Sequence, residues 1–455
     1  MNLVFFALVA ISFVVAAGRQ VFWSPGNEDE FSPMSILGSE MIQAASASVE
    51  LAIGLVGVMT LFLGLMKIAE AGGLLTIIAK TVRPLMVRLF PDVPAEHPAM
   101  GAMIMNISAN ALGLGNAATP FGIRAMEELD KLNPHKGTAT DAMALFLAIN
   151  TSSVTLLPTG VIALRAALGS NDPAGIVPTT LVATIASTTF AIIIAKSLAR
   201  FFPVVPLSAQ AAGQSASLDL VHPDDESASD PAAPYRDAPS ASAMGAGFNT
   251  GSNGYPLWVS ALVLLGIAAL VPLTVLYGKI VAPWIIPGLM MAFLGFGYFR
   301  KVRIYEVFVE GAKDGFQVAL RIIPYLVAIL VAVAMFRASG ALEVIITPLG
   351  ALTSLVGLPA EALPMALLRP LSGSGAYGLM ASIMEDPAIG PDSYTGYLVS
   401  TLQGSTETTF YVLAVYFGAI QVRRIRHALA AGLSADVIGV IAAVIITGLL
   451  YGGLN

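Results

Sequence analysis

The stretch AMALFLAINTSSVTLLPTGVIALRAA, residues 142–167, decides how the rest of the sequence is interpreted. It is long and apolar enough to cross a bilayer core of about 30 Å. Its middle is nevertheless polar, because Asn150-Thr151-Ser152-Ser153 precedes Pro158. Proline removes a backbone donor, and Asn, Thr and Ser side chains compete for backbone hydrogen bonds. We therefore expect a membrane helix that is interrupted near its midpoint.

A second segment of the same kind lies near the C-terminus. Residues 398–419 are apolar at both ends, and Gln403-Gly404-Ser405-Thr406-Glu407 interrupts them. Irregular backbone is tolerated at membrane depth only where it is buried in protein or lines a cavity. Two interrupted helices therefore predict a central polar site, with close packing of small residues as the structural alternative.

The composition places the chain in a membrane. Of its 455 residues, 56% are apolar and only 11% are charged, whereas soluble domains are about 25% charged. The absence of cysteine excludes disulfides and thiolate metal sites, and the four histidines share no ligand spacing. There is no basic patch for nucleic acid and no hydrolase, metalloprotease or phosphate-loop motif. We expect an all-α polytopic membrane protein that is not an enzyme and has no resident cofactor.

Runs of apolar residues predict the topology. Nine are long enough to cross the bilayer: 3–17, 46–66, 142–167, 176–195, 257–277, 283–299, 318–336, 398–419 and 428–450. Shorter pieces predict two re-entrant hairpins, 99–112 with 117–126 and 363–368 with 376–384. Residues 74–90 and 342–356 are apolar on one side only, so we expect them to lie along the membrane surface.

A polar linker divides the chain. Residues 203–254 are rich in Ala, Ser, Pro, Gly and Asp, a composition typical of disorder. The expected domains are residues 1–202, a first membrane half with an N-terminal helix, and residues 255–455, a second half that begins with a helical hairpin. With the N-terminus inside, most of the 23 Lys and Arg residues fall at the inner face. This orientation places the linker in the cytoplasm and the C-terminus outside.

The two halves can be aligned as an internal repeat. Pro94-Ala95-Glu96 corresponds to Pro359-Ala360-Glu361, and Thr151-Ser152 corresponds to Ser405-Thr406. Five crossings separate the starts of the copies, and this odd number inverts the second one. Inverted repeats with interrupted helices are the architecture of secondary transporters. The expected fold is two inverted repeats with re-entrant hairpins and interrupted helices.

The hairpin tips and helix breaks carry the residues expected to bind a solute. Glycines at 113, 115, 373 and 375 allow sharp reversals and close backbone approach. Uncharged donors and acceptors suit a small neutral polar solute, although a single Asn commonly makes an interhelix hydrogen bond instead. The proposed set is Asn106, Asn110, Asn116, Thr119, Asn150, Thr151, Ser152, Arg369, Ser372, Ser374, Gln403, Ser405, Thr406 and Glu407.

Two charged residues in that set lie within apolar segments. An unpaired charge there is costly, so we expect Glu407 and Arg369 to pair. Either Glu407 binds the solute or a coupling cation while Arg369 neutralises it, or the pair is purely structural. Arg165, by contrast, is expected near the interface with its guanidinium extended to water.

Longer motifs resemble a known family. The segments 66–74, 90–101 and GLGNAATP at 113–120 resemble spore maturation protein A. The segments YEVFVEGAKDGF at 305–316, RPLSGSG at 369–375 and GSTETTFYVLAVYFG at 404–418 resemble spore maturation protein B. The chain resembles a fusion of the two. This resemblance implies the nucleoside recognition (Gate) group, a bacterial inner membrane, and two hairpins and two broken helices around a central site, similar to concentrative nucleoside transporters.

Two functions follow as hypotheses. The first is a secondary transporter that moves a small polar solute, nucleoside-like or related to the cell envelope, through a midplane site, with Na⁺ or H⁺ as a possible coupling ion. The second is a non-transporting scaffold or regulator of cell-envelope and peptidoglycan machinery, by analogy with the spore cortex. Either form is compatible with a homo-oligomer in the lipid bilayer.

Overall fold

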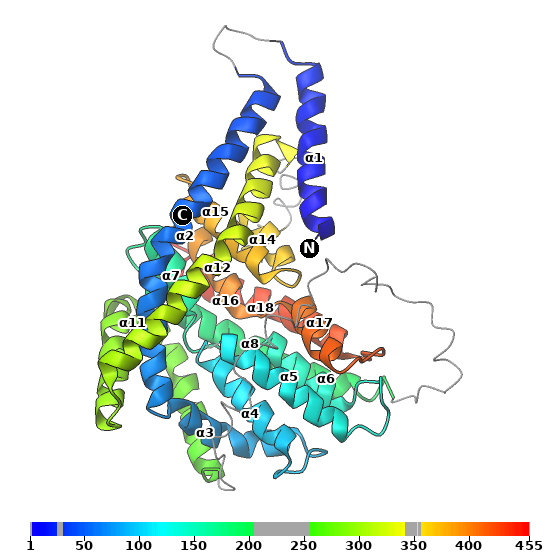
Figure 1. Cartoon of the computed structure of the whole chain (residues 1–455), viewed down its shortest axis with the longest axis vertical. Helices are drawn as coiled ribbons and strands as arrows, with labels where there is room; N and C mark the ends of the chain where they lie inside the picture. Colours follow the sequence, from blue (N-terminus) through cyan, green and yellow to red (C-terminus); the bar gives the residue numbers. More distant parts are fainter. Residues whose placement is uncertain are drawn as a thin grey trace.

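The structure is a computed structural model that describes residues 2–24, 31–113, 115–203, 254–341, 353 and 356–454, except for some side chains within these ranges (Figure 1). The described chain is helical. The predicted linker lies almost wholly outside the described residues, and so does most of the predicted surface segment 342–356. The helices of the first half are α1 (Asn2–Val21), α2 (Pro33–Ala71), α3 (Leu74–Leu89), α4 (Pro98–Ala111), α5 (Gly115–Lys131), α6 (Asp141–Thr151), α7 (Thr159–Ala167), the short η1 (Pro173–Gly175) and α8 (Ile176–Leu198).

The second half has a comparable order of elements. Its helices are α11 (Leu257–Phe299), α12 (Ile304–Ala338), the short η4 (Ala360–Ala362), α14 (Leu363–Leu368), α15 (Gly373–Glu385), α16 (Tyr394–Ser405), α17 (Thr409–Ala419) and α18 (Ala428–Tyr451). Among the described residues, three segments are long and apolar enough to cross a membrane, namely 33–71, 173–198 and 428–451. Together with the overall composition, they show an all-α protein in contact with a lipid bilayer.

The long helices α2 and α12 pack antiparallel to each other (Figure 1). Their axes approach closely because Gly311 faces Lys67 of α2 and Gly315 faces the backbone of Thr60. A Cβ added at either glycine would collide with α2. Small residues at such crossings are typical of membrane helix pairs, in which packing supplies the association energy.

The predicted crossings 257–277 and 283–299 both belong to α11, which is helical throughout. A straight helix of 43 residues would be about 64 Å long. Both ends of α11 nevertheless lie close to the junction of α2 and α3. Ser260 Oγ donates to Thr81 O (2.6 Å), and a Cβ on Gly297 would collide with Ile68. The path of α11 therefore bends back within a continuous helical stretch.

Both predicted interruptions are present, with slightly different bounds. The first helix continues through Asn150 and Thr151, and residues 152–158 separate α6 from α7. In the second, residues 403–405 are still helical, and the break between α16 and α17 is confined to residues 406–408. Helices α4 and α5 form the first hairpin, and α14 and α15 form the second, which has a much shorter first arm.

Candidate functional site

The two interrupted helices run antiparallel and their breaks meet. Phe146 of α6 stacks on Tyr416 of α17, with ring centroids 6.1 Å apart, whereas Arg165 of α7 lies over Tyr397 of α16. The first part of each interrupted helix thus lies beside the second part of the other. At the crossing point, the backbone N–H of Glu407 donates to Thr151 O (2.8 Å). This hydrogen bond joins the two breaks directly.

Each hairpin is fixed to the break of its own half by a matching backbone contact. Leu156 N donates to Ala111 O (2.9 Å) in the first half, and Phe410 N donates to Pro370 O (3.1 Å) in the second. A donor within the first break and one just after the second therefore satisfy a carbonyl at the end of the hairpin's first arm, where a helix leaves carbonyls unpaired. At the first tip Gly113 has a φ of 75°, a conformation that favours glycine.

Four neutral side chains form what we call the asparagine cluster: Asn106, Asn110, Asn150 and Tyr416. Asn110 Nδ2 (3.0 Å) and the Tyr416 hydroxyl (3.2 Å) both donate to Asn150 Oδ1. Asn106 Nδ2 donates to the Tyr416 oxygen (3.1 Å) and to Ala118 O (2.8 Å). Asn106 is fully buried, yet its Oδ1 has no hydrogen-bond partner. A buried acceptor without a donor is destabilising, so this oxygen has the capacity to accept one further hydrogen bond.

The second polar group, the arginine cluster, consists of Arg369, Gln403, Thr406, Glu407 and Thr408. Arg369 Nε donates to Gln403 O (3.1 Å), its Nη1 donates to Thr408 Oγ1 (2.9 Å), and its Nη2 donates to Thr406 O. These carbonyls lie at the C-terminal end of α16, where positive charge is favourable. Arg369 is therefore primarily a cap of the broken helix.

Glu407 lies at the exposed edge of the arginine cluster. The Arg369 Nη2 to Glu407 Oε2 distance is 3.7 Å, so the expected pair forms. The glutamate side chain is 56% exposed, however, whereas that of the arginine is 7% exposed. A pair with this spacing and exposure contributes little to stability. The Glu407 carboxylate is consequently free to interact with other groups.

Several expected hydroxyls instead bond within their own helices. Thr151 Oγ1 and Ser152 Oγ both donate to Ala148 O, at 3.0 and 2.8 Å, and Ser405 Oγ donates to Leu402 O (2.9 Å). All three residues are buried. In this structure the hydroxyls stabilise the helix ends that border the breaks.

The remaining expected residues are dispersed, apart from Gln403 of the arginine cluster. Ser372 is the N-cap of α15 and accepts a hydrogen bond from Gly375 N (3.0 Å), whereas Ser374 is exposed. Thr119 is half-buried on α5. Gln403 lies at the second break, and its buried Oε1 has no hydrogen-bond partner. The side chain of Asn116 lies outside the part of the chain that the structure describes.

The sequence set omitted three residues that the structure brings to the site. Tyr416 links Asn106 to Asn150, as described above. Thr409 Oγ1 donates to Asp436 Oδ2 (2.7 Å), and Asp436 is buried within α18. A carboxyl in an otherwise apolar membrane helix is a pointer to function, and on that ground the sequence already makes Asp436 a weaker candidate for a proton or packing role; the hydroxyl of Tyr416 could have been identified in the same way.

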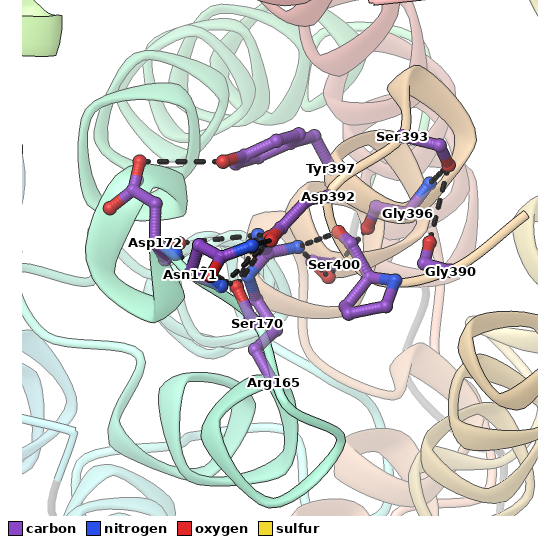
Figure 2. Close-up of polar contacts among 12 residues, drawn as sticks. Arg165, Ser170, Asn171, Asp172, Gly390, Asp392, Ser393, Gly396, Tyr397 and Ser400 are labelled. Carbon is purple, nitrogen blue, oxygen red and sulfur yellow. Dashed lines mark hydrogen bonds and ion pairs between the residues drawn. The ribbon is translucent and has the colours of Figure 1, made fainter.

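The expected exposure of Arg165 is wrong: its side chain is fully buried, and its guanidinium does not extend to water. Figure 2 shows it between the end of α7 and the loop before α16. It donates to Pro391 O (2.6 Å) and Asp392 Oδ1 (3.0 Å) and lies 4.2 Å from the centre of the Tyr397 ring. We call this group the Arg165 clasp. The sequence did not predict this group because the partners of Arg165 lie more than 200 residues away along the chain.

The groups around the Arg165 clasp reinforce it. Asp392 also accepts hydrogen bonds from Ser170 Oγ (2.5 Å) and Asn171 N (2.7 Å) (Figure 2). Burial raises the pKa of the nearby Asp172 carboxyl above its ordinary value, and the charge of Arg165 opposes that rise. The carboxylate of Asp392 is thus held by several donors from the opposite half of the chain.

A second clasp joins the other ends of the interrupted helices. Arg426 Nη1 donates to Asp141 Oδ1 (2.7 Å) at the start of α6, and Ala139 N donates to Arg424 O (2.9 Å). We call this group the Arg426 clasp. The pair of interrupted helices is therefore fastened at both ends by Arg–Asp contacts between the two halves, with the polar breaks between them.

Comparison with known proteins gives two regions of similarity. Residues 52–168 and 319–423 match the Gate family, described as nucleoside recognition. Spore maturation protein B of Bacillus subtilis (strain 168) is 49% identical over 167 residues, which cover 37% of this chain and 93% of that protein. Spore maturation protein A of the same organism is 49% identical over 154 residues, which cover 34% of this chain and 79% of that protein. No solved structure matches the chain.

Proposed function

Since this chain belongs to the nucleoside recognition (Gate) family of spore maturation proteins A and B, we propose that it is a secondary transporter of a small polar solute. The solute site lies where the two interrupted helices cross. The observation that carries the proposal is the hydrogen bond from Glu407 N to Thr151 O, because it brings two non-helical, polar stretches of opposite direction together.

The proposal includes an inverted-repeat architecture. Helices α2 and α12 run antiparallel, and so do the interrupted helices. The contact of Leu156 with Ala111 has its counterpart in that of Phe410 with Pro370. An alternating-access transporter needs two such halves around one site, since rocking one against the other exposes the site to each side in turn.

The unsatisfied oxygens indicate the class of solute. Asn106 Oδ1 and Gln403 Oε1 are buried acceptors without donors. A neutral solute rich in hydroxyl or amide N–H groups, such as a nucleoside, would supply those donors. Both interrupted helices are closely packed here, with Asn150 and Thr406 buried, so the halves must separate to admit the solute. Coupling to Na⁺ or H⁺ is part of the proposal, with Asp436 as the candidate carboxylate.

The membrane orientation is also part of the proposal. Lys80, Arg83 and Arg88 of α3, Lys131 and the Arg426 clasp belong to the loops and surface segments of one face in the topology set out above. Because cytoplasmic loops collect Lys and Arg, we assign this face to the cytoplasm of a bacterial inner membrane. The N-terminus and the linker then lie inside and the C-terminus outside.

Uptake into proteoliposomes tests the transporter proposal. The purified full-length chain would be reconstituted and offered radiolabelled nucleosides and other neutral polar solutes, under imposed Na⁺ or H⁺ gradients. We expect uptake of at least one solute, reduced about tenfold or more by Asn106→Ala, because a buried hydrogen-bonding partner is lost. Arg88→Gln, an exposed change on α3, is the matched control and should transport normally.

A scaffold of cell-envelope machinery is the second candidate, and one observation favours it. The hydroxyls of Thr151, Ser152 and Ser405 are already satisfied within their own helices, as in a static packed core. If no solute enters the proteoliposomes and none raises the melting temperature of the purified protein, the scaffold is favoured and the transporter proposal fails.

A further inference from the structure

A separate cavity of about 240 Å³ lies near the start of the first hairpin, away from its tip. Its walls come from α3, the loop before α4, the first turns of α4, and the middle of α5. Arg83, Glu96, His97 and Arg124 supply its polar lining, and Gly101 leaves room on the α4 side. None of the residues assigned to the solute site lines it.

The charges of this cavity do not balance. Arg83 is 9% exposed, and its Nη2 donates to Ala95 O (3.1 Å) and Glu96 Oε1 (2.9 Å). The Glu96 side chain is 72% exposed, so it pairs with Arg83 from the rim. Arg124 has no hydrogen-bond or ion-pair partner among the residues that the structure describes. Among the described residues, one positive charge of the cavity therefore remains uncompensated.

Two further features favour an anion. The helix α4 begins at the cavity, and a helix N-terminus carries a partial positive charge. His97 Nδ1 accepts a hydrogen bond from Ala99 N (3.2 Å), which places the proton of the neutral ring on Nε2. The ring thus offers a donor rather than an acceptor to a ligand.

We propose that this cavity binds a phosphate group, with the guanidinium of Arg124 as its principal ligand and Arg83 and His97 as supporting donors. The planar fork of an arginine matches two phosphate oxygens. The phosphate belongs either to the headgroup of an anionic lipid or to a soluble phosphate monoester. Both sources share this chemistry, and α3, an amphipathic helix with Leu85 exposed, would lie at the headgroup level of a membrane.

The experiment uses the delipidated full-length protein and two probes. Native mass spectrometry would measure the retention of phosphatidylglycerol against phosphatidylcholine. Thermal-shift titration would measure binding of glycerol 3-phosphate against glycerol, at constant ionic strength. For at least one phosphate probe, we expect Arg124→Gln to weaken binding about tenfold, since it removes a charge-assisted contact. Arg88→Gln removes the same charge from α3 outside the cavity and should bind as the wild type does.

The outcomes separate the two sources. Binding of phosphatidylglycerol alone identifies a lipid headgroup, and binding of glycerol 3-phosphate alone identifies a soluble ligand; each supports the site if Arg124→Gln weakens it. If Arg124→Gln does not fold, Arg124→Lys retains the charge without the fork and should bind with an intermediate affinity. The proposal is overturned if neither probe binds the wild type, or if the substitutions at 124 and 88 have equal effects. None of these readouts depends on transport.

Discussion

At the break of the first interrupted helix, a backbone carbonyl accepts its hydrogen bond from a neutral group. At the break of the second, the carbonyls accept theirs from a buried cation. At the first break Thr188 Oγ1 donates to Ser152 O, and the neighbouring asparagine cluster is uncharged. At the second, Arg369 covers the carbonyls of Gln403 and Thr406. A neutral amide network can exchange a partner for a solute at low cost, but a buried guanidinium must keep all its acceptors. Under the proposed function, the first break can exchange a hydrogen-bonding partner for the solute, whereas the Arg369 side of the second break stays rigid and only Gln403 Oε1 there offers the solute an acceptor.

Of the substitutions considered, removal of the Arg369 side chain should lower the free energy of unfolding the most. Arg369→Ala leaves the carbonyls at the end of α16 without their donor, and we expect the free energy of unfolding to fall by about 1–3 kcal/mol for each carbonyl. Denaturant unfolding in detergent would measure it. Arg369→Lys, which retains the charge but loses the fork, should be intermediate. Wild-type stability of Arg369→Ala would contradict the assignment of this break as the rigid one.

Equivalent glycines at the two hairpin tips should respond differently. Gly113→Ala forces a Cβ against Leu157 O at a positive φ, so we expect a loss of about 2 kcal/mol. Gly373→Ala displaces the Thr408 hydroxyl, which accepts from Arg369, but Gly373 does not have the positive φ of Gly113, so the loss should be smaller. Thermal unfolding of the two variants side by side checks this, and the reverse order would show that the tips are not packed as described.

Removal of a single hydroxyl, that of Tyr416, breaks two hydrogen bonds of the asparagine cluster. Tyr416→Phe removes the donor to Asn150 Oδ1 and the acceptor for Asn106 Nδ2, at a cost of about 1–2 kcal/mol. The phenyl ring still stacks on Phe146, so the fold should persist. If the asparagine cluster recognises the solute, uptake should fall more than stability does. An equal change in both would assign Tyr416 a structural role only.

The smallest change in stability is expected at Glu407. Glu407→Gln removes a loosely spaced, half-exposed pair, so the free energy of unfolding should change by less than about 1 kcal/mol. Transport would be measured in the same preparation as a function of pH. A lower rate or a shifted pH profile would assign the carboxylate to the mechanism, and an unchanged rate and profile would remove it.

Local patterns in the sequence predicted the elements that local chemistry determines. Pro158 and the polar run before it predicted the first interruption, and the glycine-rich tips predicted the hairpins. Both follow from backbone preferences within a few residues. The reversal between residues 257–277 and 283–299 was also predicted, but its form was not, because the chain turns back within helical structure despite Gly278 and Pro283.

Tertiary partners explain most of what the sequence did not predict. An arginine near a helix end is ordinarily extended to water, but Arg165 is enclosed by Pro391, Asp392 and Tyr397 from the other half. In the same way, Thr151 and Ser152 have the composition of a binding site, yet their hydroxyls bond to the preceding helical turn. Periodicity and motif spacing do not determine which of two available acceptors a hydroxyl chooses.

The Arg165 and Arg426 clasps join residues 227 and 285 positions apart, and the core around the breaks mixes side chains from both halves. Neither half can bury its own polar middle alone. A peptide tether between them converts a second-order assembly reaction into a first-order one, at an effective concentration of about a millimolar. The stoichiometry of the two halves is then set at one to one by translation, and dilution of the protein in the membrane cannot dissociate them.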